Sequence, residues 1–209
     1  MSPACNTLIN GIVFGVALIL FGILGLGGWL LSYRLPKAAP IGPGRWMFAL
    51  PRWVQISGWL AISIFCGYLG YVLWLPLPLS VVLAVSIWLR LAGLAVFLVG
   101  ASLVFWARCA LGVMWGVSTS FAVQMLTEHR LIRHGPYAFV RHPMYLGYWL
   151  TLFGILLIYR TWTALFLFVL CLVSFYLRAR REEKALASAF GKEWKRYAMR
   201  TKFLIPLMY

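Results

Sequence analysis

The polar residues best suited to bind a ligand gather in residues 129–147, which read HRLIRHGPYAFVRHPMYLG. This stretch contains all the histidines of the chain, which are His129, His134 and His142. The pair Gly135-Pro136 predicts a turn, and Pro143 disfavours helical backbone at His142. The sequence therefore predicts an irregular, aromatic-rich segment of the kind that can cradle a ligand.

Three histidines close together could instead bind a metal ion. The chain has no Asp, however, and its cysteines (Cys5, Cys66, Cys109 and Cys171) are too widely spaced to form a thiol pair. His129 and His142 also lack the i, i+4 spacing that places two ligands on one helix face. We therefore predict neither a metal site nor a disulfide framework.

A second polar cluster follows the last apolar segment and consists of Arg178, Arg181, Glu182 and Glu183. It contains half of the acidic residues, since the chain has only four. Arg178 and Glu182 are four residues apart and therefore share one face of a helix. They could form an ordinary ion pair, worth about 0.3–0.5 kcal/mol. Alternatively, the carboxylate could attract a cationic ligand and the arginine an anionic one.

The segments that must position these clusters are strongly apolar. Of 209 residues, 63% are hydrophobic and 11% charged, whereas soluble domains have roughly 25% charged residues. Residues 8–31, 54–74 and 79–106 are each long enough to span a bilayer, which takes about 20 residues. Residues 145–159 and 162–177 are shorter, at about 22–24 Å each. We predict an all-α integral membrane protein with about five transmembrane helices, the last two forming a hairpin.

Basic residues decide the predicted orientation and partners of the chain, whose net charge is +15. Lys and Arg gather in residues 33–52, in residues 107–144 and in the tail from residue 178, whereas the 75–78 connection has none. The positive-inside bias then places the N-terminus outside, and both polar clusters and the C-terminus in the cytosol. The membrane is expected to be a plasma (inner) membrane or one of the endoplasmic-reticulum type. Because these charges flank apolar segments, they suit lipid headgroups, and no nucleic-acid partner is expected.

Two further features concern the C-terminal tail and the third apolar segment. Residues 182–200 predict an amphipathic interfacial helix, with an apolar face made by Leu186, Phe190, Trp194 and Tyr197. Arg90 interrupts the third apolar segment and needs a polar partner or a cavity there. The sequence leaves open whether Arg90 is a packing residue or lines a substrate cavity.

The two clusters, in this order and separation, resemble those of the isoprenylcysteine carboxyl methyltransferase family, within the wider phospholipid and isoprenylcysteine methyltransferase superfamily. The similarity extends from Leu111 to Pro206, whereas residues 1–107 match only as generic membrane helices. The matching motifs are LG-x-x-W at 111–115, H-x-L-[IV]-x-x-G-x-Y at 129–137, RHPMY at 141–145, EE at 182–183, L-x-x-x-FG at 186–191 and FLIP at 203–206.

The resemblance implies a methyltransferase that uses S-adenosyl-L-methionine and releases S-adenosyl-L-homocysteine. It implies one membrane domain, 1–209, in which residues 108–209 bind the cofactor on the cytosolic side. The residues expected to line the cofactor pocket are His129, Leu131, Ile132, Tyr137, His142, Pro143, Met144, Tyr145 and Glu182. Arg178 would face a lipophilic acceptor, the carboxylate of a prenylcysteine-type substrate, and the candidate catalytic residues are Arg178, Glu182 and His142. The sequence departs from the family pattern at Trp194, where Tyr is common, and at Arg130.

The residue types suit this chemistry on physical grounds. A carboxylate and aromatic faces attract a sulfonium cation, and in-line methyl transfer needs alignment and exclusion of water. A carboxylate acceptor needs no general base, so Arg178 would only orient it. An ethanolamine amine would first have to lose a proton, for which His142 or Glu182 is the candidate base. Arg178 would then hold the lipid phosphate.

Other functions remain open from sequence alone. A phospholipid amine or a thiol could replace the carboxylate as methyl acceptor on the same fold. Sterol reductases resemble the C-terminal part and bind NADPH, but they would need more helices and a larger pocket. A non-enzymatic membrane protein could use the same pocket for sensing or assembly, although Arg178, Glu182 and the RHPMY motif together argue against it.

Overall fold

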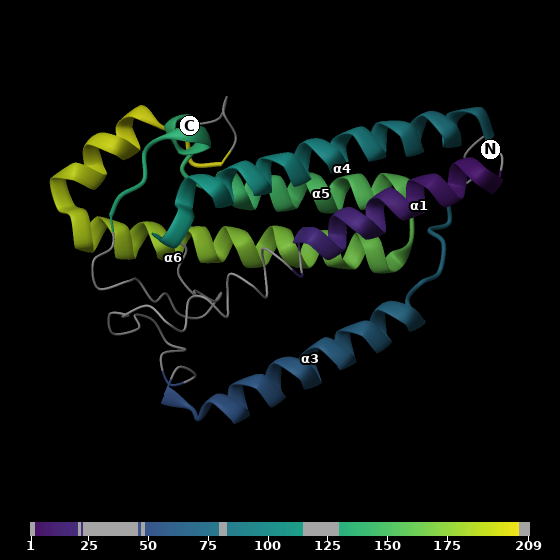
Figure 1. Ribbon diagram of the computed structural model, residues 1–209, viewed down its shortest axis with the longest axis horizontal. Coiled ribbons are helices and arrows are strands. Elements are labelled where there is room, and N and C mark those ends of the chain that lie inside the picture. The colour runs from purple at the N-terminus through teal and green to yellow at the C-terminus, as the bar shows by residue number, and fades with distance from the viewer. Residues whose placement is uncertain are drawn as a thin grey trace.

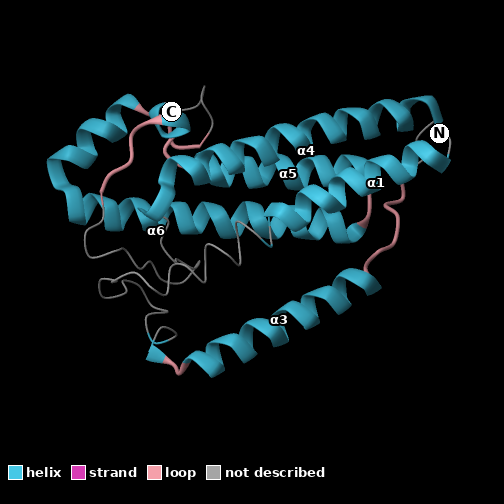
Figure 2. Cartoon of the chain, in the orientation of Figure 1, coloured by secondary structure: helices cyan, strands magenta, loops and turns pink. Residues whose placement is uncertain are grey.

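The computed structural model describes residues 3–20, 22, 46, 49–79, 83–114 and 130–204. Within these residues the chain consists of helices joined by loops, as Figure 2 shows. The α-helices are α1 (Pro3–Leu18), α3 (Arg52–Val72), α4 (Leu83–Leu111), α5 (Pro143–Tyr159) and α6 (Trp162–Arg200). Two short 3₁₀ helices, η3 (Gly112–Met114) and η4 (Gly135–Ala138), lie between α4 and α5. The predicted all-α fold is confirmed.

The helices follow the apolar segments of the sequence. α3, α4 and α5 correspond to the predicted segments 54–74, 79–106 and 145–159. α1 covers the first part of segment 8–31, most of whose remainder lies outside the described residues. Among the described helices, three contain stretches long and apolar enough to cross a membrane, which are Trp53–Val72, Val85–Leu111 and Trp162–Arg200. α1 and α5 are apolar but shorter.

α6 joins two elements that the sequence treats separately, the segment 162–177 and the amphipathic tail 182–200. It runs for 39 residues because Leu, Arg and Ala continue the helix between them, and all three are good helix formers. Its direction changes at Gly191, whose φ of 48° and ψ of −112° are not helical and suit only glycine readily. In Figure 1 the last, yellow part of α6 therefore bends back toward the end of α4. We treat the part up to Leu177 as membrane-spanning and the charged remainder as lying beyond it.

The apolar face predicted for the tail exists. Trp194 and Tyr197 are buried, whereas Leu186 and Phe190 are half-buried. The buried pair lies beyond the Gly191 bend, so this part of the tail packs against the protein itself. An additional interfacial location of the tail stays a prediction.

The core of the bundle is the contact between α4 and α5, which glycines make unusually close. A Cβ atom added at Gly154 in α5 would lie 2.5 Å from the backbone nitrogen of Phe97. A Cβ added at Gly100 in α4 would lie 2.5 Å from the backbone nitrogen of Thr151. Small residues at such positions let the backbones of membrane helices approach and pack. α1 covers this pair on one side, where its Ile9 and Val13 pack against Phe97.

The two ends of the bundle are built differently. At one end α1, α4 and α6 begin and α5 ends, on the right in Figure 1. There the 160–163 turn pairs with residues 73–77, through bonds such as Leu77 N–H to the Arg160 carbonyl at 2.8 Å. At the other end the chain after α6 pairs with the segment before α5, where Arg141 N–H donates to the Lys202 carbonyl at 2.8 Å. Both predicted polar clusters meet at this second end.

Candidate active site

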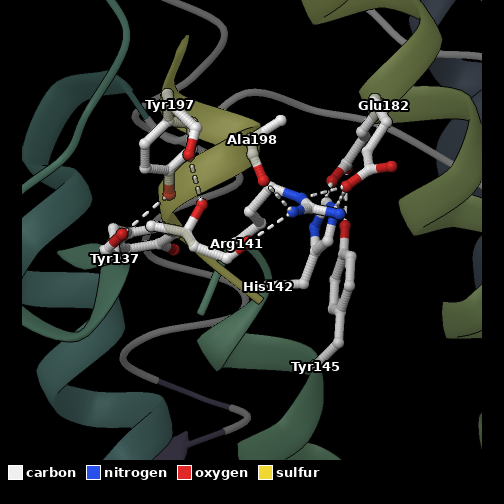
Figure 3. Close-up of polar contacts among 9 residues, drawn as sticks. Tyr137, Arg141, His142, Tyr145, Glu182, Tyr197 and Ala198 are labelled. Atoms are coloured by element: carbon white, nitrogen blue, oxygen red, sulfur yellow. Dashed lines mark hydrogen bonds and ion pairs between the residues drawn. The ribbon is translucent and has the colours of Figure 1, made fainter. Parts of the chain in front are cut away.

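The first turn of α5 presents two site residues to α6. His142 is the N-cap of α5, with φ −125° and ψ 57°, and Pro143 is the first helical residue. This is the break at His142 that the sequence predicts, because a proline fits the first turn but disfavours helix before it. The side chains of His142 and Tyr145 consequently lie side by side and reach toward Glu182 on α6 (Figure 3).

The Glu182 carboxylate is the meeting point of the two predicted clusters. The Tyr145 hydroxyl donates to its Oε1 at 2.5 Å, and Arg178 Nε donates to the same oxygen at 3.3 Å. His142 Nδ1 lies 3.7 Å from Oε2. The predicted i, i+4 pair of Arg178 and Glu182 therefore exists, and its side chains retain 20% and 21% exposure, enough for a ligand to reach them.

Aromatic rings form one wall of this site. The Tyr145 ring is parallel to Phe175, with centroids 5.1 Å apart, and nearly parallel to the His142 ring at 5.5 Å. The guanidinium carbon of Arg178 lies 5.5 Å from the Tyr145 ring centroid, within the range of a cation–π contact. Stacking against both rings restricts the Tyr145 ring and thereby favours the direction of its bond to Glu182.

A second carboxylate, Glu183, holds the site to the C-terminal part of the chain. Arg141 Nε donates to Glu183 Oε1 at 2.5 Å, and both side chains are largely buried. Arg141 Nη1 also donates to the carbonyls of Ala198 at 2.9 Å and Thr201 at 2.5 Å. Both carbonyls lie at the C-terminal end of α6. Burial raises the pKa of Glu183, but the neighbouring His142 and Arg141 lower it more, so the net pKa lies below its ordinary value. The carboxylate is therefore ionised at neutral pH.

The two predicted polar clusters include Arg141 and Glu183, but the sequence assigned neither a role in the site. A signal for them was present, because Arg141 belongs to the RHPMY motif and Glu183 to a rare pair of adjacent acids. Their contact joins residues 42 positions apart, so no local spacing rule predicts it.

One polar atom of this buried region has no hydrogen-bond partner among the described residues. His142 is 6% exposed, and its Nε2 makes no hydrogen bond there. Glu183 Oε1 lies 3.6 Å away, within the range of an ion pair but too far for a direct hydrogen bond. Such an atom suits a polar group of a bound molecule, because an unpaired buried polar atom costs about 1–3 kcal/mol.

Tyr137 supports the site from the 3₁₀ helix η4. Its carbonyl accepts a hydrogen bond from the Tyr197 hydroxyl at 2.8 Å, which ties η4 to the bent end of α6 (Figure 3). Burial, with a smaller effect of Glu182, raises the pKa of Tyr137 well above its usual value. The phenol is therefore neutral at any working pH and does not serve as a base.

The remaining predicted residues lie in different surroundings. Tyr137 and Met144 belong to an apolar cluster with α4 residues, and Ile132 packs against that cluster. Pro143 is fully buried, and Leu131 is half-buried. His129 lies outside the described residues. His142, Tyr145, Arg178 and Glu182 are thus the predicted residues that the structure joins by polar and ring contacts.

This fold and site agree with the relationships of the sequence. A family model described as phospholipid methyltransferase matches residues 88–193. The chain belongs to this phospholipid methyltransferase family and is an integral membrane protein. The resemblance predicted from the motifs is thereby confirmed at the level of the family.

Individual relatives match part of the chain. Protein-S-isoprenylcysteine O-methyltransferase of Schizosaccharomyces pombe is 34% identical over 82 residues, which cover 39% of this chain and 35% of the yeast protein. The uncharacterized protein YpbQ of Bacillus subtilis is 31% identical over 96 residues, or 45% of this chain and 55% of that protein. The chain therefore aligns with about one third to one half of the length of these relatives.

A comparison of solved structures gives a match that spans nearly the whole chain. The eukaryotic intramembrane Ras methyltransferase ICMT, an isoprenylcysteine carboxyl methyltransferase, superimposes with a TM-score of 0.52 at 17% identity. The match covers 99% of this chain and 87% of the other. At this identity the similarity establishes a shared fold.

Proposed function

We propose that this chain is a membrane-embedded methyltransferase that uses S-adenosyl-L-methionine to methylate the carboxylate of a lipophilic, prenylcysteine-type acceptor. The observation that carries the proposal is the junction of α5 and α6, where the Arg178–Glu182 pair meets the rings of His142 and Tyr145. Family membership supports methyl transfer, and the name of the yeast relative supports the isoprenylcysteine acceptor.

The residues present fit this cofactor. The Nε2 of buried His142, which has no hydrogen-bond partner among the described residues, would provide a polar contact, and the Glu182 carboxylate would provide negative charge for a cationic ligand. The ring of Tyr145 adds an aromatic face that favours a cation. Leu131, Ile132, Tyr137, Pro143 and Met144 would complete the pocket with apolar surface and backbone, together with His129. When bound, the cofactor supplies an electrophilic methyl group.

The protein residues would act by binding and alignment. Glu182 would hold the cofactor's positive charge, and Tyr145 would keep that carboxylate in place through its hydrogen bond. Arg178 would orient the acceptor carboxylate through its guanidinium group, as guanidinium groups do for carboxylates. Because a carboxylate is already nucleophilic, no general base is required. The lipophilic part of the acceptor would lie in the bilayer, with the site on the cytosolic side.

Titration calorimetry with S-adenosyl-L-homocysteine and the detergent-purified protein tests the cofactor site. We expect saturable binding that Glu182→Gln weakens at least about tenfold, since a charged contact contributes roughly 1.5–3 kcal/mol. Glu193→Gln is the matched control, because Glu193 pairs with Arg133 on the exposed surface. Equal affinities in the two variants would remove Glu182 from the cofactor site.

Turnover separates the role of Arg178 from that of Glu182. Arg178→Ala should leave S-adenosyl-L-homocysteine binding largely intact and lower the methylation rate, with Arg133→Ala as the control. An equal loss of binding and turnover would place Arg178 in the cofactor site instead.

A second acceptor, the amine of a phospholipid ethanolamine, is favoured by one specific observation. His142 lies within 3.7 Å of Glu182, so a candidate proton acceptor stands beside the proposed cofactor site. Methylation of an ammonium group would require this base, and the rate would then rise with pH and fall in His142→Gln. If the rate of methylation of a prenylcysteine analogue does not depend on pH, the carboxylate is supported as the methyl acceptor.

A further inference from the structure

The bundle end opposite the candidate active site contains two arginines whose charge the described protein does not neutralise. Arg90 in α4 donates from Nη1 to the Asn6 side-chain oxygen of α1 at 2.5 Å. Arg160, at the end of α5, donates from Nη2 to the Ser86 hydroxyl at 2.7 Å. Both acceptors are neutral. The sequence predicts that Arg90 needs a polar partner, and the structure supplies the side-chain amide of Asn6. Because an amide is neutral, it does not compensate the positive charge of Arg90.

Each of these arginines also has a buried N–H group without an acceptor. Arg90 Nε and Arg160 Nη1 are inaccessible to solvent and make no hydrogen bond within the described residues. Leaving a charged donor unpaired and buried is costly. The described glutamates, which are Glu182, Glu183 and Glu193, lie beyond Leu177 at the other end of the bundle. They are separated from this end by the length of α5, about 25 Å for its 17 residues.

The two guanidinium groups are held near each other. Ser86 and Arg90 are four residues apart in α4 and so share one helix face; Arg160 reaches this face through its bond to Ser86. Burial, and then the positive charge of Arg90, lower the pKa of Arg160 below its usual value. The two like charges therefore repel each other, and a shared anion would relieve that repulsion.

The backbone at Arg160 is constrained as well. Its φ of 50° and ψ of 48° are left-handed, the only such conformation at a non-glycine residue described here. This costs an L-residue about 1–2 kcal/mol, and glycine is usual at such a helix end. The turn is fixed by bonds from Leu77 N–H to the Arg160 carbonyl and from Trp162 N–H to the Leu75 carbonyl. Arg160 is therefore attached to a turn whose backbone is fixed. A basic side chain on an unconstrained loop could instead extend its charged group into water.

We propose that Arg90 and Arg160 together bind one phosphate-type anion at this end of the bundle, either the headgroup phosphate of a phospholipid in the adjacent leaflet or free phosphate. Guanidinium groups present paired N–H donors that match phosphate oxygens. The N-terminus of α6, which begins two residues after Arg160, adds the favourable end of a helix dipole. Basic pockets between membrane helices are suited to lipid headgroups.

The test uses the full chain in an uncharged detergent and compares three additives. These are phosphatidylglycerol, a diacylglycerol with the same acyl chains, and inorganic phosphate replacing chloride at constant ionic strength. The Tm is measured as a function of additive concentration for the wild type, Arg90→Gln and Arg160→Gln. Arg196→Gln is the matched control, because it removes one positive charge from an exposed residue at the other end of the bundle.

A headgroup site predicts that phosphatidylglycerol raises the Tm and diacylglycerol does not, whereas a site for free phosphate predicts the same rise with inorganic phosphate. In either case Arg90→Gln and Arg160→Gln should weaken the apparent affinity about tenfold, the effect of one charged contact. Arg196→Gln should leave it unchanged. Arg90→Lys and Arg160→Lys keep the positive charge and should retain part of the Tm shift. They test the site even where a glutamine variant fails to fold.

Two results would overturn the proposal. One is the absence of any Tm shift with phosphatidylglycerol and with phosphate. The other is an equal shift in Arg90→Gln, Arg160→Gln and Arg196→Gln, which would assign the effect to general surface charge. Binding of S-adenosyl-L-homocysteine, measured on the same samples, should be unaffected by Arg90→Gln, so this site and the proposed function can fail independently.

Discussion

The close approach of α4 and α5 makes a quantitative prediction for Gly154→Ala. The new Cβ would lie 2.5 Å from Phe97 N, 2.6 Å from the Gly93 carbonyl oxygen and 2.7 Å from Phe97 Cα. All three are backbone atoms, so no side chain can rotate away. Ordinary contact begins near 3.4 Å, and the helices would therefore have to separate locally by about 0.9 Å, the difference between 3.4 and 2.5 Å.

Overpacking of this kind costs about 1–3 kcal/mol, and alanine returns about 0.5–1 kcal/mol of helix propensity. At the middle of both ranges the net loss is about 1 kcal/mol, which lowers the Tm of a chain of this size by roughly 2–4 °C. Gly11→Ala in α1 is the matched control, because nothing lies within 4 Å of its added Cβ. This variant should be as stable as the wild type or slightly more stable.

Thermal unfolding in detergent, followed by far-ultraviolet circular dichroism, measures both variants. A Tm for Gly154→Ala equal to or above that of Gly11→Ala would refute the argument that glycine holds these helices in contact. The same displacement should reach His142 and Tyr145, which occupy the first turn of α5. A misplacement of about 1 Å can lower a rate about 100-fold. We therefore expect the methylation rate of folded Gly154→Ala to be lower than that of the wild type, beyond what the loss of folded protein explains.

Three other predictions concern the contacts that hold the site together. Arg141→Ala leaves Glu183 and two carbonyls at the end of α6 without their donor, and should destabilise the protein by about 3–5 kcal/mol in thermal unfolding; a loss below about 1 kcal/mol would contradict a structural role. Glu183 has a lowered pKa in the folded state, so its stabilising effect is present above its unfolded pKa of about 4.3 and is lost as pH falls through the folded value. Glu183→Gln should therefore flatten the decrease of Tm with falling pH below about 4.3, whereas Glu193→Gln should keep it. Tyr197→Phe removes the bond to the Tyr137 carbonyl and should cost about 1–3 kcal/mol, with unchanged Tm as the contradicting result.

The local elements of this protein follow from its sequence. Apolar runs such as 54–74 and 145–159 predict helices, because backbone in a bilayer must satisfy its own hydrogen bonds. The helix start at Pro143 follows from the fixed φ of proline, and the Arg178–Glu182 pair follows from the period of the helix. These are short-range rules, and the structure agrees with each of them.

The contacts between distant segments were decided only by the tertiary structure. Arg141 meets Glu183 across 42 residues, and Tyr197 meets the Tyr137 carbonyl across 60. The bend at Gly191 brings the tail back to η4, and no periodicity indicates its direction. The sequence alone does not distinguish Gly154 from other small residues, because its importance lies in its contact with the backbone of α4. Which residues complete a site thus depends on how helices pack, since packing depends on the shapes of whole surfaces and not on the spacing within one segment.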